Sequence, residues 1–271
     1  GSEDGLSKYP YIRESLRIVA KTRVAEQDLN IDSETENRAR FFGDSIGTGF
    51  YMVDIHPCGA NERGRMMMPK PFQIPMSALV PQGVDNFLPA SKNIGVTHLT
   101  NGAFRLHPIE WNIGEVAAVM ASLTLQKGSL PKAAQVQEVI AKDGVPLVWF
   151  DDLAVSHPAF AEIHMAAVHG WYPLEKGNLH ASPDAPVTRR ETAEILTAYF
   201  GQKLFGQEAI DYVVKQGWMA VDHRNWFHAD LPLYWTDIRE DQLPRRLALW
   251  HMRATGPVSR AELARRLTGG K

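Results

Sequence analysis

The chain has 271 residues, of which 44% are hydrophobic and 22% are charged; this composition is ordinary for a folded protein and excludes disordered and fibrous classes. Its formal net charge of −2 provides no basic field to attract nucleic acid or an anionic membrane. No apolar run approaches the roughly 20 residues of a membrane span. The single cysteine, Cys58, excludes an internal disulfide. We interpret it as a small buried residue, and we assign no metal site.

The first part of the chain predicts strands and exposed segments. Partial alternation of apolar and polar side chains favours a strand over residues 9–20, and the polar residues 24–40 predict a turn and an exposed segment. Residues 41–56 show a strand-like pattern. Glycines that permit a bulge or a close backbone approach interrupt it at Gly43, Gly47 and Gly49.

Asp54 and His56 stand two residues apart in this extended segment, so their side chains point to the same face. A carboxylate beside an imidazole can perform acid/base chemistry. A simple hydrogen bond explains such a pair equally well, and the sequence leaves both interpretations open. Residues 57–71, which include Met66 to Met68, then predict a long loop, and residues 72–81 predict a strand broken at Pro75.

Residues 86–123 are the most informative stretch. Residues 86–91 predict a short strand, and Pro108, which is preferred in a first helical turn, predicts a helix that begins near Ile109. The free N–H groups and the dipole at a helix start stabilise electron-rich ligand atoms. A polar turn lies between strand and helix and contributes Thr97, His98, Asn101, Gly102, Arg105 and His107.

Small residues recur along the predicted helix at spacings of three and four. They are Gly114, Ala117, Ala118 and Ala121. Such a face would let a neighbouring backbone or a flat ligand approach closely. A tightly packed core helix is the alternative interpretation.

The order and spacing of six positions carry a resemblance to a known family. The positions are Thr97, His98, Gly102, Arg105, Pro108 and Gly114, preceded by YIRESLRI, DSIGTGFYMVDIH, FQIPMSALVP and VDNFLPASKNI. Over residues 9–123 the chain resembles the C-terminal half of bacterial FAD-dependent oxidoreductases, which have the two-domain architecture of glutathione-reductase-like flavoproteins. In that family, the helix that follows the proline closes over the flavin ring.

The resemblance implies a cofactor-binding set. The N–H groups at the start of the helix would face the flavin, and Gly114 would let this helix pack against the cofactor-binding sheet. The implied positions are Thr97, Asn101, Gly102, Pro108, Ile109 and Gly114.

The resemblance also implies catalytic roles. His98 and Arg105 would stand near the flavin face as a base and a cationic anchor for a substrate hydroxyl or carboxylate. His56 is the alternative proton acceptor, with Asp54 as the group that orients it. The implied reaction is hydride transfer between the flavin and an unidentified small organic substrate.

FAD is the implied cofactor, but half of its usual site is missing from the sequence. Flavoproteins of this architecture bind the ADP part of FAD with a strand, a G-x-G-x-x-G turn and a helix, and no such fingerprint occurs here. We therefore expect a C-terminal piece of a longer flavoprotein or a truncated relative with another role. The opening Gly1-Ser2, which looks like a scar from an expression tag, favours the first.

The second half of the chain predicts helices. Residues 131–142 predict an amphipathic helix that ends at Asp143-Gly144. From about residue 148, helices alternate with turns rich in Pro and Gly, and an internal repeat is visible: residues 186–191 (PVTRRE) are echoed by residues 257–262 (PVSRAE). Each repeat predicts a capping box, formed by Thr188 with Glu191 and by Ser259 with Glu262.

Residues 148–267 resemble S-layer homology repeats, on the basis of an F-x-D opening and the PVTRRE helix start. This resemblance implies that Arg189 and Arg260 help to bind cell-wall polysaccharide. The alternative interpretation is a helical packing module in which each arginine pairs with a glutamate.

We therefore expect an α+β chain of two domains. Residues 1–145 would be the C-terminal portion of an FAD-dependent oxidoreductase, and residues 146–271 an all-helical domain like S-layer homology repeats. The alternative functions are a non-catalytic carbohydrate or cell-surface binding module and an interaction domain. The implied partners are a small-molecule substrate, the missing N-terminal nucleotide-binding half or a second copy, and cell-wall polysaccharide. The sequence leaves open whether the protein is exported or cytoplasmic.

Overall fold

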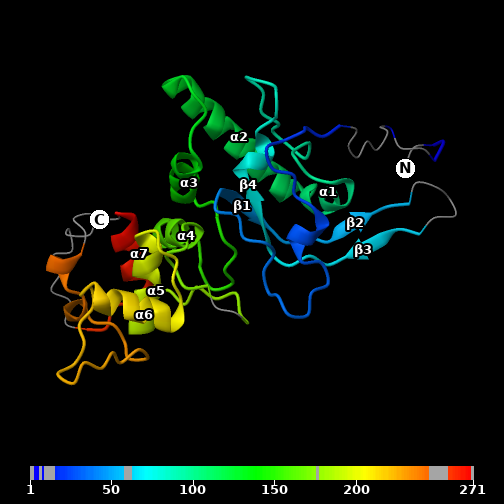
Figure 1. The fold of residues 1–271 in the computed structure, drawn as a ribbon. Helices are drawn as coiled ribbons and strands as arrows, with labels where there is room; N and C mark the ends of the chain where they lie inside the picture. Colours follow the sequence, from blue (N-terminus) through cyan, green and yellow to red (C-terminus); the bar gives the residue numbers. More distant parts are fainter. Residues whose placement is uncertain are drawn as a thin grey trace.

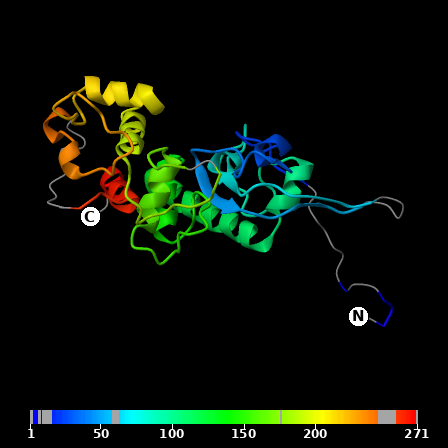
Figure 2. The ribbon, with the colours of Figure 1, turned by 90° about the horizontal axis from the view of Figure 1, so that it is seen from below.

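The computed structural model describes residues 3–5, 8, 16–57, 63–174, 177–243 and 256–269. The molecule is elongated, with a two-stranded arm at one end and a group of helices at the other (Figures 1 and 2). No helix among the described residues has the length and apolar content needed to cross a membrane. Cys58 and residues 9–15 of the first predicted strand lie outside the described ranges.

Four short strands form two antiparallel pairs in the first part. β1 (Ser45–Gly49) pairs with β4 (Phe72–Pro75), and β2 (Val53–Ile55) pairs with β3 (Arg65–Met67). The register of β1 against β4 shifts between Ser45 and Thr48, as the interrupting glycines predict. The β2–β3 pair projects away from the body of the molecule (Figure 1).

Several predictions for this part are corrected by the structure. Residues 16–20 form no strand, only an isolated bridge from Ala20 to Pro81. The polar residues 24–40 are not all exposed, because the 3₁₀ helix η1 (Glu26–Leu29) buries Leu29 in the core. The predicted methionine loop is wrong for Met66 and Met67, which lie in β3. The break at Pro75 is confirmed, since β4 ends there and the 3₁₀ helix η2 (Met76–Leu79) follows.

Residues 86–91 form no strand either. Asn86 adopts a left-handed φ of 56°, and the segment runs in irregular conformation. The polar turn predicted after it is mostly a helix, α1 (His98–Phe104). Thr97 caps this helix, because its Oγ1 accepts from the Thr100 N–H at 3.1 Å while the Thr100 hydroxyl accepts from the Thr97 N–H at 2.8 Å.

The long helix α2 (His107–Lys127) begins as predicted, with Pro108 in its first turn. Gly128 ends it with a φ of 71°, a left-handed conformation that glycine adopts without steric cost. The next helix, α3 (Ala133–Lys142), is also confirmed and stops at Asp143-Gly144.

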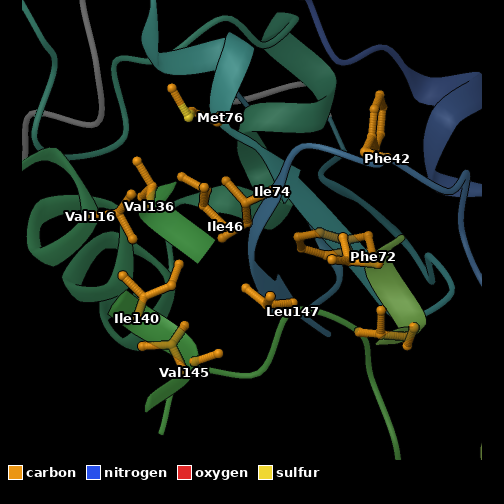
Figure 3. Close-up of a cluster of buried hydrophobic side chains, with 14 of the residues drawn as sticks. Phe42, Ile46, Phe72, Ile74, Met76, Val116, Val136, Ile140, Val145 and Leu147 are labelled. Carbon is orange, nitrogen blue, oxygen red and sulfur yellow. The ribbon is translucent and has the colours of Figure 1, made fainter. Parts of the chain in front are cut away.

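The core of the first part lies between the β1–β4 pair and the helices α2 and α3. Figure 3 shows the buried side chains that meet there, among them Ile46, Ile74, Val116, Val136 and Ile140. Burying each such side chain contributes about 1.5–3 kcal/mol. The buried Gln137 of α3 fixes the helix to the edge of β1, because its Nε2 donates to the carbonyls of Gly43 and Ser45 at 3.0 and 2.9 Å.

The second part is helical, as predicted. It contains α4 (Phe160–Val168), α5 (Arg189–Tyr199), α6 (Gly206–Lys215), α7 (Arg260–Thr268) and the 3₁₀ helices η3 (Trp235–Asp237) and η4 (Glu240–Gln242). Beyond residue 148 the described residues contain isolated β-bridges but no strand. The fold is therefore of mixed α+β class.

The two predicted capping boxes differ. Thr188 and Glu191 form the complete box at the start of α5. Ser259 accepts from the Glu262 N–H at 3.2 Å, but the Glu262 carboxylate turns toward Arg266, whose Nε lies 3.0 Å away. The second box is therefore only half formed.

Helix α7 joins two hydrophobic clusters. The first cluster runs from Val24 to Ala181 and also includes Ala261 and Ala264, and the second runs from Val187 to Leu267. Because α7 packs against α4 while its other apolar side chains enter the second cluster, the C-terminal helix connects the two parts of the fold.

Candidate functional site

Asp54 lies in β2, and His56 follows the last residue of that strand. The Nε2 of His56 lies 2.7 Å from the Oδ2 of Asp54, so the prediction that they share a face is confirmed. The His56 side chain is 50% exposed and that of Asp54 is 18% exposed. The pair thus presents an imidazole to solvent while a mostly buried carboxylate holds one of its nitrogens.

Arg105 reaches the same pair from the end of α1. Its Nη2 donates to the backbone carbonyl of Asp54 and lies 3.7 Å from the Asp54 carboxylate. The Arg105 side chain is only 8% exposed. Its guanidinium therefore faces Asp54 from within the fold.

Gly102 explains why α1 can approach β2 so closely. A Cβ atom at this position would lie 2.9 Å from the backbone nitrogen of Asp54 and 3.1 Å from its oxygen, which is closer than carbon atoms pack. The glycine therefore brings Arg105 to Asp54. The structure thus gathers four of the predicted site residues at one place.

The remaining residues of α1 are placed differently. His98 is the exposed first residue of the helix, and Thr97 caps the helix while donating its hydroxyl to Glu26 at 2.5 Å. Asn101 is fully buried, and both polar atoms of its side chain lack a hydrogen-bond partner among the described residues. Such an amide costs stability unless another group satisfies it.

Backbone N–H groups at the start of α2 already form hydrogen bonds within the protein. Pro108 has no N–H, and the N–H groups of Ile109 and Glu110 both donate to the Leu106 carbonyl at 2.9 Å. Ile109 is buried in the core. The first turn therefore has few free donors for a ligand.

Gly114 was expected to let α2 pack against a cofactor-binding sheet, and this stays a prediction. A Cβ atom there would lie 3.0 Å from the Ala90 carbonyl oxygen. Among the described residues, the glycine lets the irregular segment 86–91 approach α2.

Comparison with known proteins identifies the family of this chain. A family model described as FAD dependent oxidoreductase matches residues 3–142, which is just over half of the 271 residues. The chain belongs to the FAD-dependent oxidoreductase family. No curated protein and no solved structure matches it. The matched region contains β1 to β4, α1 and α2, and thus the whole Asp54–His56–Arg105 cluster.

Membership of the FAD-dependent oxidoreductase family implies FAD as the cofactor. The described residues do not fit a complete FAD site. The closest glycine pair, Gly47 and Gly49, lies in an antiparallel strand, and Cβ atoms there would overlap Asn112 and the Phe72 ring at 1.8 and 2.6 Å. These glycines therefore serve packing within the domain, whereas an ADP site needs a turn between a strand and a helix.

None of the predicted cofactor-binding residues lines the open groove beside Phe50 and Trp149 or the smaller pocket beside Thr48 and His164. Asn101, with its unpartnered amide, is the residue among them that a bound group would satisfy, but it has no solvent-exposed surface.

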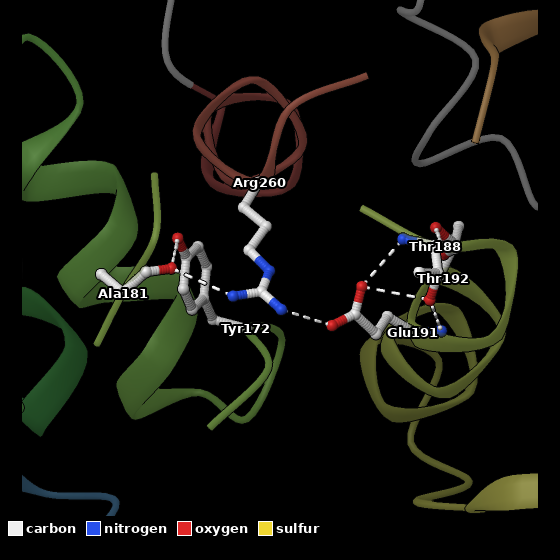
Figure 4. Close-up of polar contacts among 6 residues, drawn as sticks. All are labelled: Tyr172, Ala181, Thr188, Glu191, Thr192 and Arg260. Carbon is white, nitrogen blue, oxygen red and sulfur yellow. Dashed lines mark hydrogen bonds and ion pairs between the residues drawn. The ribbon is translucent and has the colours of Figure 1, made fainter. Parts of the chain in front are cut away.

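In the second half, Arg189 and Arg260 are buried, each with a side chain 8% exposed. Arg189 forms an ion pair with Asp237 at 2.5 Å, and its guanidinium lies 4.7 Å from the centre of the Phe227 ring. Arg260 pairs with Glu191 (Figure 4). These contacts are those of the helical packing interpretation, in which arginines pair with acidic side chains.

Proposed function

We propose that residues 1–145 form the substrate-facing and flavin-capping portion of a glutathione-reductase-like FAD-dependent oxidoreductase. The reaction would be hydride transfer between the flavin and a small organic substrate. Family membership supports the reaction class. The observation that carries the assignment of a reacting group is the Asp54–His56 pair, an exposed imidazole held by a mostly buried carboxylate within the matched region.

His56 is the proposed proton acceptor. Its Nε2–H donates to Asp54, which leaves Nδ1 as the nitrogen with a free lone pair. Nδ1 would take the proton of a substrate hydroxyl or amine as the substrate is oxidised. Asp54 would stabilise the resulting imidazolium, and Arg105 would position Asp54. His98, also exposed, is the second candidate for the proton acceptor.

The ADP-binding half of the cofactor site would come from outside these 271 residues. Either a longer polypeptide or a partner chain, including a second copy, would supply the G-x-G-x-x-G turn that this sequence lacks. Residues 146–271 would then form a helical appendage, which shares the first hydrophobic cluster as far as Ala181.

The alternative function has less support. A non-catalytic module like S-layer homology repeats would use Arg189 and Arg260 to bind cell-wall polysaccharide. Both guanidinium groups are already buried in ion pairs. Breaking a buried ion pair costs more free energy than a hydrogen bond to a ligand hydroxyl would restore.

The test uses the natural-length protein isolated with its flavin and any partner chain that supplies the ADP-binding half, and it measures anaerobic flavin reduction by small alcohols, 2-hydroxy acids and amines. For the substrate that reduces the flavin fastest, His56→Gln should slow reduction by about 100-fold or more without loss of flavin. The matched control is His223→Gln, which changes an exposed histidine in the helical second part and should leave the rate unchanged. An unchanged rate in the His56 variant would exclude this residue as the proton acceptor.

A further inference from the structure

An open groove of about 710 Å³ lies between the oxidoreductase portion and the segment that follows it. One bank consists of residues 32, 33, 37 and 68–71, and the other of residues 149, 151 and 177–180. Its volume lies within the range of about 300–1,000 Å³ that is usual for small-ligand sites. The groove contains none of Asp54, His56 and Arg105, so it is separate from the proposed reaction site.

Backbone hydrogen bonds hold each bank in place. The Asp32 N–H donates to the Met68 carbonyl at 2.9 Å on one side, and the Asp151 N–H donates to the Leu179 carbonyl at 3.0 Å on the other. Arg38, which follows Asn37 of the first bank, links the two banks because its Nη1 donates to the Trp149 carbonyl of the second. Burial lowers the pKa of this arginine from its usual value, and the Asp151 carboxylate opposes that shift.

Two aromatic side chains form a wall of the groove. Phe50 is 46% exposed, and its ring meets Trp149 edge to face with 5.8 Å between ring centres. The Trp149 indole is further oriented by Asp151, whose Oδ1 accepts from Nε1 at 2.7 Å. These contacts hold the rings before any ligand arrives, which reduces the entropic cost of binding.

Polar side chains surround this wall. The carboxylates of Asp32 and Asp151 and the amide of Asn37 line the groove, together with Lys70. Each carboxylate uses one oxygen in a local hydrogen bond, to the Met68 N–H or to Trp149. The second oxygen of each has no hydrogen-bond partner among the described residues and remains able to accept hydroxyl groups.

This chemistry selects among ligand classes. Asp32 and Asp151 line the groove with Lys70, and the Arg38 guanidinium offsets Asp151, so the lining has no excess positive charge to select a phosphate or another anion. The Lys70 and Asp151 N–H groups already donate within the fold, so the groove offers little of the backbone ladder by which an extended peptide binds. A sugar ring instead has apolar C–H faces that pack on aromatic rings and hydroxyls that donate to carboxylates.

We propose that this groove binds a neutral oligosaccharide, with sugar faces against Phe50 and Trp149 and hydroxyls donated to Asp32 and Asp151. The site goes beyond the proposed oxidoreductase function and does not rest on it. It also differs from binding through Arg189 and Arg260, since neither arginine lines the groove.

Isothermal titration calorimetry of the full chain with cellohexaose, xylohexaose, maltohexaose and chitohexaose tests the proposal. At least one of these sugars should bind saturably. Phe50→Ala should weaken that binding by about threefold to tenfold, because it removes an aromatic contact. The matched control is Phe205→Ala, which removes a ring that is 70% exposed and outside the groove and should leave the affinity unchanged.

Asp32→Asn provides a second variant that keeps the shape of the side chain and an oxygen for the Met68 N–H. It should also weaken sugar binding, whereas Asp85→Asn, at an exposed position outside the groove, should not. The proposal is overturned if no sugar binds at millimolar concentration, or if both groove variants bind sugar as the parent does. Saturable binding of spermine without any sugar binding would also overturn it, in favour of a cation site.

Discussion

Arg260 of α7 donates to the carboxylate of Glu191 in α5 across 2.6 Å, although 69 residues separate them in the chain (Figure 4). The side chains are 8% and 20% exposed. Arg260 also donates to the Ala181 carbonyl, which accepts from the Tyr172 hydroxyl at 2.9 Å. Burial raises the pKa of Tyr172, so its hydroxyl stays protonated and able to donate. The repeated PVTRRE and PVSRAE motifs thus meet each other in the fold.

We predict that Arg260→Met lowers the free energy of unfolding by about 3 kcal/mol, because it leaves a mostly buried carboxylate without its cation. Urea unfolding measures this loss. The control Lys142→Met breaks the ion pair with Glu138 on an exposed helix face and should change stability little. A double-mutant cycle with Glu191→Gln should show strong coupling, and additive losses would show that the pair contributes no specific stability.

Gly102→Ala should destabilise the protein by about 1–3 kcal/mol, because the added methyl group would overlap the backbone of Asp54. The same change should move α1 away from β2 and so loosen the contact of Arg105 with Asp54. Gly43→Ala is the matched control, since its Cβ would lie 3.9 Å from the nearest atom outside the adjoining residues, the Val168 carbonyl oxygen. Equal melting temperatures for the two variants would contradict the close packing of α1 on β2.

His164 predicts a pH dependence of stability. Burial lowers the pKa of this histidine from 6.5 to about 3, and its Nδ1 accepts from the Val148 N–H at 3.4 Å. Below about pH 6.5 the unfolded chain binds a proton that the folded chain does not. The stability that this group contributes is therefore present above that pH and is lost progressively as the pH falls toward 3.

Chemical unfolding between neutral and mildly acidic pH checks this prediction. His164→Gln should be less stable at neutral pH but should lose less stability on acidification than the parent. His107→Gln, at an exposed position, should retain the full pH dependence. A parent-like slope in the His164 variant would show that other groups produce the acid sensitivity.

Local signals predicted the helices well. Pro108 marked the start of α2, the capping pair of Thr188 and Glu191 marked α5, and Asp143-Gly144 marked the end of α3. Each of these signals acts within one helical turn, so it is readable from neighbouring residues. The same locality explains why Asp54 and His56 were correctly paired.

Contacts between distant segments were not predictable in the same way. The segment 86–91 resembles a strand, but it packs as irregular chain on Gly114 and finds no strand partner. The sequence predicts a turn in place of α1 because the partner of the capping residue Thr97 is Thr100, at a position where the usual signal is a glutamate or glutamine. The groove depends on Phe50 meeting Trp149, and nothing in either local sequence indicates that contact.

We propose that residues 1–145 are part of a flavoprotein whose ADP-binding half is supplied from outside this sequence. The most direct measurement is the flavin content of the protein isolated from its own cells at natural length, with any partner it carries. Acid extraction and chromatography should release FAD in an amount close to one per copy of this chain. Protein that is isolated intact and folded but contains no FAD would contradict this proposal.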